Sequence, residues 1–253
     1  MGEIHPHLIR YWLHSSEKVD YPETFAEKVN EIFTVYHETE EVRKKSGHTI
    51  SVEKRTGMQA LEHKYPYKPA IPRKAARMEF ESIRHGTIHL IGFFDVATGR
   101  MERPYLNPTR TEEYFVEAIR ALVETDPEAS WTFVCDGLNI HKSESLVRFV
   151  AEQCGLSEDL GCKGKSGILK NQESREEFLH QKDHRIRIVY TPKYCSWMNQ
   201  IEIWFGMINR RLLKRKSYQS IEELKESILR FIEQYNIMAK PFRWTYKGIP
   251  LTV

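Results

Sequence analysis

Apolar residues recur at three- and four-residue steps in five segments of the chain, which is the pattern of amphipathic helices that pack on a core. In the first segment Phe25, Val29 and Ile32 keep this spacing, and Asp20 followed by Glu23 can cap its start. The segments predicted as helices are residues 20–45, 111–124, 143–153, 199–216 and 221–238. Each is predicted to bury one face and expose the other.

Short runs of β-branched and aromatic residues predict five strands between these helices. Residues 88–96 and 100–106 are joined through a turn that contains Gly99, which indicates an antiparallel hairpin. The apolar run Trp131-Thr-Phe-Val-Cys135 is typical of a buried strand. The predicted strands are residues 48–53, 88–96, 100–106, 131–135 and 185–190.

The remaining segments are predicted as connections. A turn-rich stretch with three prolines follows residue 53, and residues 155–170 are polar and rich in Gly and Lys, so they are predicted as an inserted loop. Three antiparallel strands followed by alternating strands and helices predict an α/β fold, with one mixed sheet and helices on both of its faces. The 253 residues fit one large domain, or one domain with an appendage, at roughly 150 residues per domain.

Composition excludes two classes of protein. With 40% hydrophobic and 29% charged residues, the chain is not intrinsically disordered. The longest apolar stretch, residues 88–97, is interrupted by His89 and Asp95 and is shorter than the ~20 residues of a membrane helix. The N-terminus lacks the layout of a signal peptide, so a cytoplasmic protein with no membrane partner is expected. The four cysteines have no zinc-type or redox-type spacing and are expected to be free thiols.

Charge is unevenly distributed along the chain. The net charge is only +3, but the segment from Met207 to Tyr218 carries five cations and no acidic residue. Such a segment can bind a polyanion, although a solvated helix face is the alternative interpretation. Its cations are Arg210, Arg211, Lys214, Arg215 and Lys216.

Three acidic residues stand at the ends of predicted strands or at the start of a helix. Glu53 and Asp136 end their strands, and Glu202 lies at the edge of an apolar helix face. A carboxylate placed so close to a core is costly unless it is paired or binds a cation. Three such groups suit a pair of Mg²⁺ ions, which use oxygen ligands and catalyse phosphoryl displacement. The alternatives are a turn or cap role for Asp136 and a helix-dipole role for Glu202.

Several motifs resemble those of the bacterial insertion sequence 630 transposases, which are relatives of the mariner transposases. The matching motifs are Arg10-Tyr-Trp-Leu13, Pro22-Glu-Thr-Phe25, Thr56-Gly-Met-Gln-Ala-Leu61, Arg84-His-Gly-Thr87, Asp136-Gly-Leu-Asn139, His141-Lys-Ser143, Thr191-Pro-Lys193, Ser196-Trp-Met-Asn-Gln-Ile-Glu202-Ile-Trp-Phe205, Ala239-Lys-Pro-Phe242 and Trp244-Thr-Tyr-Lys-Gly248. This resemblance implies a DDE catalytic domain with a ribonuclease-H-like, mixed five-stranded sheet.

The resemblance also implies roles for individual residues. Glu53, Asp136 and Glu202 would be the catalytic and metal-binding triad for two Mg²⁺ or Mn²⁺ ions, and Asn139 and His141 would support these ligands. The substrate would be double-stranded DNA, namely transposon ends and a TA target, and the protein could act as a homodimer associated with the bacterial nucleoid. The residues predicted to contact DNA are Lys193, Asn199, Arg211, Lys214, Arg215 and Lys216.

The chain departs from the family pattern at its metal site. The family has an aspartate where this chain has Glu53, a glutamate where it has Lys54 and an asparagine where it has Gly137. The extra methylene of Glu53 shifts the carboxylate oxygens, and a displacement of about 1 Å can lower a rate roughly 10²-fold. The segment before Arg10 is too short to encode the helix-turn-helix modules of such transposases, so a catalytic half is expected.

Residues 1–47 are accordingly predicted to form an N-terminal helical linker segment, and residues 48–253 the catalytic domain. Residues 155–185 are predicted to be an insertion relative to compact mariner relatives. Two alternatives to an active transposase stay open at this point. One is an inactive remnant that acts only in DNA binding or assembly, and the other is a stand-alone ribonuclease-H-like nuclease.

Overall fold

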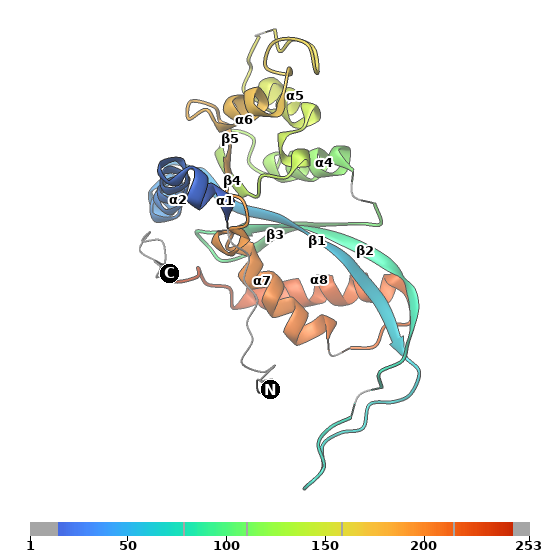
Figure 1. Cartoon of the computed structure of the whole chain (residues 1–253). Coiled ribbons are helices and arrows are strands. Elements are labelled where there is room, and N and C mark those ends of the chain that lie inside the picture. The colour runs from blue at the N-terminus through green and yellow to red at the C-terminus, as the bar shows by residue number, and fades with distance from the viewer. Residues whose placement is uncertain (1–14, 78, 110, 158, 215, 245–253) are drawn as a thin grey trace, which may run out of the picture.

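A computed structural model describes residues 15–77, 79–109, 111–157, 159–214 and 216–244. Its centre is a five-stranded sheet in the order β3-β2-β1-β4-β5 (Figure 1). The strands are β1 (Gly47–His63), β2 (Ser82–Asp95), β3 (Met101–Asn107), β4 (Ser130–Cys135) and β5 (Ile186–Tyr190). Strand β2 is antiparallel to both of its neighbours, whereas β1, β4 and β5 are parallel. The predicted mixed five-stranded α/β sheet is confirmed.

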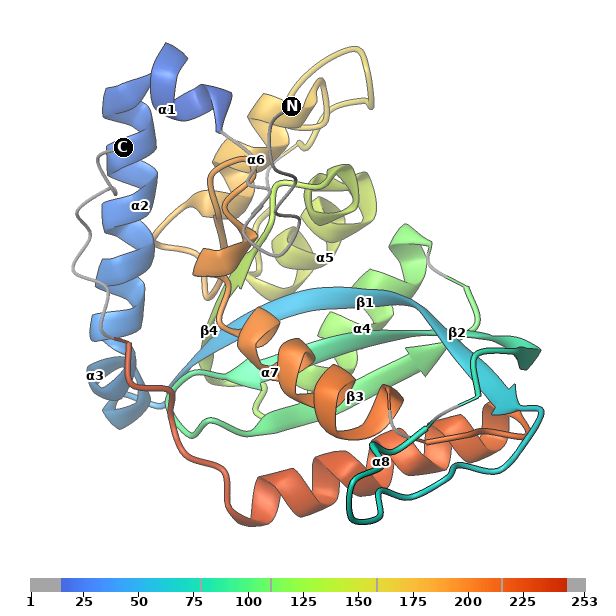
Figure 2. The same ribbon diagram turned by 60° about the horizontal axis from the view of Figure 1, so that its bottom comes forward.

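Helices cover both faces of this sheet, as Figures 1 and 2 show. Helices α4 and α5 lie on one face with α6 beside them, and α7 and α8 lie on the other. The helices are α1 (Ser16–Asp20), α2 (Pro22–His37), α3 (Thr39–Lys44), α4 (Glu112–Val123), α5 (Glu144–Gln153), α6 (Gln172–His180), α7 (Ile201–Ile208) and α8 (Ile221–Ile237). Two 3-10 turns, η2 (Asn139–Lys142) and η3 (Ser196–Met198), and a π-helical turn, η4 (Asn209–Leu213), complete the elements used below.

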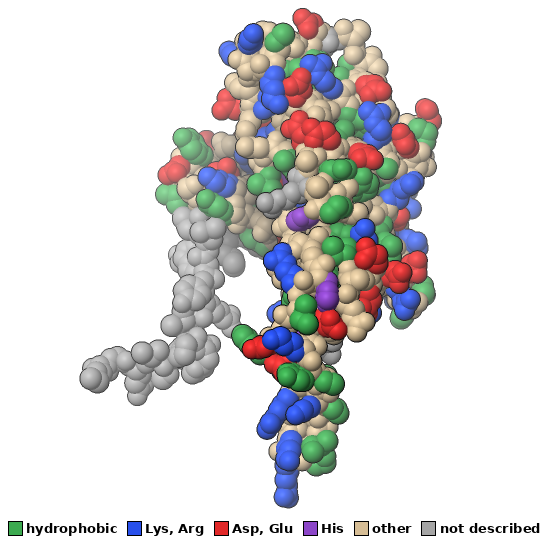
Figure 3. All heavy atoms as spheres, turned by 90° about the vertical axis from the view of Figure 1, so that its right-hand side faces the viewer, with side chains coloured by type: hydrophobic (Ala, Val, Ile, Leu, Met, Phe, Trp, Pro, Cys, Tyr) green, Lys and Arg blue, Asp and Glu red, His purple; other side chains and the backbone are tan. Residues whose placement is uncertain are grey.

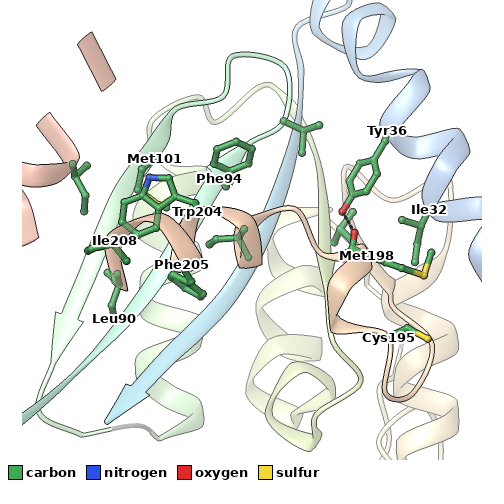
Figure 4. Packing of buried hydrophobic residues seen from close by; sticks show 14 of the residues in the cluster. Ile32, Tyr36, Leu90, Phe94, Met101, Cys195, Met198, Trp204, Phe205 and Ile208 are labelled. Atoms are coloured by element: carbon green, nitrogen blue, oxygen red, sulfur yellow. Dashed lines mark hydrogen bonds between the residues drawn. The ribbon is translucent and has the colours of Figure 1, made fainter. Parts of the chain in front are cut away.

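Each face of the sheet has its own apolar core. On one face, fully buried side chains such as Phe133, Ile119 and Leu146 join β4, α4 and α5. On the other face, Trp204, Phe205 and Ile208 of α7 pack against Leu90, Phe94 and Met101 of the strands (Figure 4). Because β1 is central, its alternating side chains contribute to both cores, and the polar residues Thr49, Ser51 and Glu53 in its first half are buried.

Strand β1 is much longer than predicted. It continues from residue 53 to His63, and β2 begins at Ser82 instead of residue 88. The β1–β2 pairing shifts register between Arg55 and Met58, where one extra residue in β1 moves the following side chains to the opposite face. Ile50 and Val52 therefore face one core, whereas Met58 and Ala60 face the other. Because of this switch, apolar and polar residues do not alternate regularly along the whole of β1, and the alternation pattern does not predict its second half.

Two helix predictions also need correction, and one helix was not predicted. Residues 20–45 form α2 and α3, and residues 199–216 form α7 followed by the π-helical turn η4, with Asn199 before the helix. The stretch 155–185 contains helix α6, which was not predicted. Its start has a capping box, in which the Asn171 side chain accepts from the backbone N–H of Ser174 at 2.8 Å. Only one apolar pair, Phe178 and Leu179, is buried in α6, so its periodicity is weak.

The described part of the N-terminal segment shares a core with the rest of the fold. Phe25, Val29 and Ile32 of α2 belong to the same buried cluster as α7. The Tyr36 hydroxyl donates to the carbonyl oxygen of Met198 at 2.9 Å, and Arg187 of β5 pairs with Glu31. A separate linker would not bury such a face, so we propose that residues 15–244 form one structural unit without a boundary at 47/48.

Two further features concern composition. The four cysteines are free, and Cys135 and Cys195 are buried, so the free-thiol prediction is confirmed. Within the described ranges, no helix combines the length and the apolar character needed to cross a membrane. The buried apolar side chains form two cores, one between each face of the sheet and the helices that cover it.

Gly92 allows α7 to lie close to the sheet. It pairs with Glu53 across the β1–β2 ladder, and a β-carbon added to it would lie 2.8 Å from Ile201 Cδ1 and 3.3 Å from Met101 Sδ. Any larger residue at this position must therefore displace the Ile201 side chain or move α7, which carries Glu202.

We expect Gly92→Ala to lower the free energy of unfolding by about 1–3 kcal/mol, the usual cost of overpacking a core. Gly137→Ala is a matched control, because its β-carbon would meet only Lys142 Nζ at 3.6 Å, an ordinary contact. Urea denaturation of both variants measures the difference. Equal stabilities would show that α7 moves without cost.

Candidate metal centre

Parallel pairing of β1 with β4 places two carboxylates side by side. Ser51 of β1 is opposite Val134 of β4, and continuing this register by two residues brings Glu53 beside Asp136. Neighbouring strands lie about 4.8 Å apart, and residues in register point to the same face. Two acidic residues that are 83 positions apart in the sequence therefore meet where β4 ends, beside the middle of the longer strand β1.

A ligand atom of His141 joins this pair. One oxygen each of Glu53 and Asp136 and one ring nitrogen of His141 all lie within 4.8 Å of one another. Glu53 is 7% exposed and His141 is fully buried, whereas Asp136 is partly open to solvent. Carboxylate oxygens are the ligands that Mg²⁺ and Mn²⁺ prefer, so these residues fit a hard divalent cation.

His141 orients Asp136. Its Nδ1 lies 2.7 Å from Asp136 Oδ1 and 3.0 Å from the Asp136 carbonyl oxygen. Both neighbours are acceptors, so Nδ1 carries the proton and donates it. The Tyr190 hydroxyl donates to the His141 carbonyl oxygen at 2.7 Å and fixes the turn η2. The position therefore suits the supporting role expected for His141, since such hydrogen bonds set the direction of a metal-binding carboxylate.

The backbone N–H of Leu138 also donates to Asp136 Oδ1, at 3.2 Å. Asp136 thus has the turn role that was its alternative interpretation, and it lies in the acidic cluster as well. Asn139, the other residue expected to support the ligands, is exposed at the start of η2. No hydrogen bond from the Asn139 side chain to the acidic cluster is present among the described residues.

Ionisation of the buried carboxylates in this site is electrostatically unfavourable. Burial, followed by the negative charge of Asp136, raises the pKa of Glu53 from 4.5 to about 7. His141 and the backbone N–H of Lys54, which donates to Glu53 Oε1 at 2.7 Å, act in the opposite direction. Like charges that are close together in a dry site can both ionise only if a cation compensates them.

Glu202 lies close to this pair but outside its tightest group. It is in the first turn of α7, half-buried, so the helix-dipole interpretation also fits its position. Burial raises the pKa of Glu202, the charge of Arg55 lowers it and the charge of Asp136 raises it. Glu53 also responds to the charge of Glu202. The three predicted acidic residues therefore interact electrostatically in one region of the fold.

Asn199 and Ser51 attach the start of α7 to β1. The Ser51 hydroxyl donates to Asn199 Oδ1 and accepts from the backbone N–H of Ile201 at 2.8 Å, while Asn199 Nδ2 donates to the Val52 carbonyl oxygen at 3.0 Å. Asn199 is 0% exposed. This burial is incompatible with the predicted contact between Asn199 and DNA, because its amide is already bonded within the protein. We propose instead that it positions Glu202 relative to Glu53.

A pocket of about 430 Å³ opens beside Asp136. Lys193 lines it from the loop after β5 and is exposed, which is compatible with its predicted contact with DNA. Lys142 lines it from η2, and its Nζ lies 2.6 Å from Glu176 Oε2 of α6. The sequence analysis did not predict Glu176 as part of the site, because it did not predict helix α6. Lys142 belongs to the motif His141-Lys-Ser143, but no role was predicted for it.

The other predicted DNA-binding residues follow α7. Arg211 lies in η4 and Lys214 directly after it, and both are exposed. Lys216 is exposed too, but its Nζ pairs with Glu223 Oε1 at 3.2 Å and donates to Ser227 Oγ at 2.7 Å. Arg215 lies outside the described residues. π-Helical turns are rare and often lie at functional sites.

Asn199→Ala should lower the free energy of unfolding by about 1–3 kcal/mol, because the buried Val52 carbonyl and Ser51 hydroxyl lose their partner. Asn139→Ala is the matched control, since Asn139 is exposed and its loss should change stability by no more than about 0.5 kcal/mol. Urea denaturation measures both. Equal stabilities would show that the hydrogen bonds of Asn199 to β1 do not stabilise the position of α7.

The raised pKa of Glu53 predicts a pH dependence of stability without metal. The folded state binds this proton more tightly than the unfolded state, so the contribution is complete below pH 4.5 and is lost as pH rises through about 7. The expected loss is on the order of 3 kcal/mol. Thermal unfolding of wild type and Glu53→Gln between pH 5 and 8 tests this.

Glu53→Gln should match wild type at pH 5 and be more stable at pH 8. Mn²⁺ should restore the stability of the wild type at pH 8 and have less effect on Glu53→Gln, since metal ligands must be deprotonated. Parallel pH profiles for the two proteins would rule out this role of Glu53.

Comparison with known proteins identifies the fold. The chain superimposes on the Mos1 strand transfer complex with a TM-score of 0.55 and 11% identity, covering 95% of this chain and 60% of that chain. A pre-cleavage Mos1 transpososome gives a TM-score of 0.54 and 12% identity, covering 92% of this chain and 60% of that chain. The Mos1 mariner paired end complex with Mn gives a TM-score of 0.52 and 13% identity, also covering 92% of this chain and 60% of that chain. At such identities the likeness shows the fold, which is the ribonuclease-H-like fold expected from the motifs.

The chain thus spans about 60% of the length of these Mos1 chains. A search of curated protein sequences gave no match. Residues 56–225 match the family model described as DDE superfamily endonuclease. Asp136 and Glu202 lie inside the matched region, and Glu53 lies three residues before it. The match covers more than half of the chain, which therefore belongs to the DDE superfamily of endonucleases.

Proposed function

We propose that this chain is the catalytic unit of a transposase of the insertion sequence 630 type, which cuts DNA at transposon ends and joins the ends to target DNA. The observation that carries the proposal is the convergence of Glu53 and Asp136 in a site that raises the pKa of Glu53 to about 7. A carboxylate pair that is this unfavourable without a cation is suited to binding one. The family match to a DDE endonuclease supports the same conclusion.

Glu53, Asp136 and Glu202 would hold two Mg²⁺ or Mn²⁺ ions. Such ions act as Lewis acids on a phosphate and lower the pKa of a bound water. The chain's own groups position the ligands, because His141 donates to Asp136 and Asn199 ties the start of α7 to β1. Glu53 must lose its proton before it can act as a ligand.

The proposed reaction has two steps. In the first, a water oxygen attacks the phosphorus at a transposon end, the bond from phosphorus to the 3′ oxygen breaks, and this oxygen takes up a proton. In the second, the freed 3′-hydroxyl loses its proton and attacks a phosphodiester of the target at a TA step, which displaces the target's own 3′ oxygen. Both steps displace a 3′ oxygen in line at phosphorus, so one acidic site serves both.

Partners and setting follow from this proposal. Duplex DNA would bind over the acidic cluster, with Lys193 in the pocket beside Asp136 and with Arg211 and Lys214 beyond Glu202. Recognition of specific ends would need helix-turn-helix modules supplied outside the segment described here, and a homodimer would bring two ends together. The protein would work at the nucleoid of a bacterial cell.

One observation favours a second candidate function, an inactive transposase remnant. Glu53 replaces the aspartate of the family pattern, and its pKa of about 7 leaves it partly protonated at neutral pH without metal. A protein whose site has decayed in this way would still bind DNA through its cations. A stand-alone nuclease, the third interpretation, would cleave DNA without transposon ends.

Cleavage of a transposon-end duplex, with the family's recognition modules added in trans, tests the proposal. We expect Mn²⁺-dependent nicking that Asp136→Asn lowers at least about 10²-fold and that Glu53→Asp raises. Asp183→Asn is the control, because it removes an exposed carboxylate before β5 and should leave the rate unchanged. Gel analysis of end-labelled DNA measures each rate.

Different failures lead to different conclusions. If neither wild type nor Glu53→Asp nicks DNA, and calorimetry detects no Mn²⁺ binding that depends on Asp136, the chain is an inactive remnant. If wild type nicks duplexes with and without transposon ends equally, the chain is a general nuclease.

A further inference from the structure

The hairpin that joins β1 to β2 extends away from the rest of the molecule (Figure 1). We call its outer part, residues 64–77, the basic arm. It contains five cations and no acidic residue, and the cation at its base, Lys64, pairs with Glu81, with 2.5 Å between Nζ and Oε2. The five cations are Lys64, Lys68, Arg73, Lys74 and Arg77. Figure 3 shows Lys and Arg side chains gathered along this projection, at the bottom of the view.

The arm has a regular backbone that brings like charges together. Lys68 and Arg77 are paired across the hairpin, with N–H to carbonyl distances of 2.9 Å in both directions. Ile71 and Lys74 form the next pair, at 3.1 and 2.8 Å, around a turn that contains Arg73. Like charges directly opposite each other destabilise a strand pair. The folded protein gains nothing from this arrangement, whereas a polyanion on the arm would compensate it.

The edges of the arm are poorly suited to pairing with another strand. Pro66, Pro69 and Pro72 have no backbone N–H, and lysines flank them. Proline and lysine on an edge strand are features that prevent sheet-to-sheet association. The side chains of the arm are therefore better candidates for binding a partner than its backbone is.

The arm continues the basic segment that follows α7. The backbone N–H of Tyr218 donates to the Leu61 carbonyl oxygen at 2.8 Å, and the N–H of His63 donates to Ser217 Oγ at 2.9 Å. Lys64 thus starts beside the end of the segment that carries Arg211 and Lys214. Exposed cations therefore occur in and directly after η4 and again along the hairpin to its tip.

We propose that the basic arm binds the phosphate backbone of duplex DNA at a distance from the acidic cluster. Ten residues of β1 separate Glu53 from His63, and at about 3.3 Å per residue they span about 33 Å. This length corresponds to about ten base pairs of B-form DNA, with 3.4 Å per base pair. The arm therefore contacts DNA about one helical turn away from the scissile phosphate, and this inference rests on the proposed function.

Binding of a fluorescent 30-base-pair duplex in EDTA, at 50 to 200 mM salt, tests the proposal. The combined variant Lys68→Ala, Arg73→Ala and Arg77→Ala should lower the slope of log K against log salt by about 2.7, since each phosphate contact contributes about 0.9. At 100 mM salt the affinity should fall at least about tenfold. Fluorescence anisotropy measures both quantities.

A control variant removes the same charge elsewhere. Lys44, Arg100 and Arg148 each pair with a carboxylate on the surface, at 2.6, 3.5 and 2.8 Å. Their combined replacement by Ala should change the slope by less than about one contact. Arg211→Ala with Lys214→Ala should add its own loss of slope to that of the arm variant, because one 30-base-pair duplex spans both sets.

A slope that the arm variant leaves unchanged would overturn the proposal. If light scattering then also shows a change in molar mass from dimer to monomer, the arm binds a second copy of the chain instead. Tyr65, Tyr67 and Phe80, which are 66%, 55% and 97% exposed, would serve that contact. Binding in EDTA requires no cleavage, so a failure of the proposed activity would not affect this result.

Discussion

The structure depends on keeping two carboxylates next to each other where little water reaches them. Strands β1 and β4 are parallel, and continuing their register by two residues places Asp136, directly after β4, beside Glu53 within β1 and on the same face. Burial and then the charge of Asp136 raise the pKa of Glu53 to about 7, so Glu53 is partly protonated at neutral pH. An arrangement with this cost persists only if the surrounding fold imposes it, and buried polar groups around the site do so.

These groups act through different elements. His141 fixes Asp136 through the turn after β4, and Asn199 with Ser51 fixes the start of α7 against β1. Gly92 supplies the space that α7 needs directly across from Glu53. None of these contacts joins one acidic residue to another. The spacing of the carboxylates is therefore a property of the packed core, and changes in that core reach the site without touching it.

Sequence patterns predicted the elements that carry the acidic residues better than those that surround them. The strand before Asp136 is an uninterrupted apolar run, and the helix with Glu202 repeats bulky residues, so both signals are local. Strand β1 was predicted only as far as Glu53, because the extra residue before Met58 reverses its alternation. Helix α6 has one buried apolar pair, and the burial of Asn199 depends on β1, 147 residues earlier in the chain. A local sequence pattern cannot predict a hydrogen-bond partner that is so distant along the chain.

Charge is arranged on a larger scale than any single motif. The acidic residues lie in β1, directly after β4 and in the first turn of α7, partly or largely buried, whereas exposed cations lie along η4 and the projecting hairpin. Separated in this way, the two sets do not neutralise one another, because the cations stay in solvent and the carboxylates stay largely out of it. A ligand that satisfies both sets must be negative along its length and must bring cations to the acidic cluster. The DNA duplex with bound metal ions that we propose as the substrate would have both properties, so it would compensate a charge distribution that is unfavourable in the isolated fold.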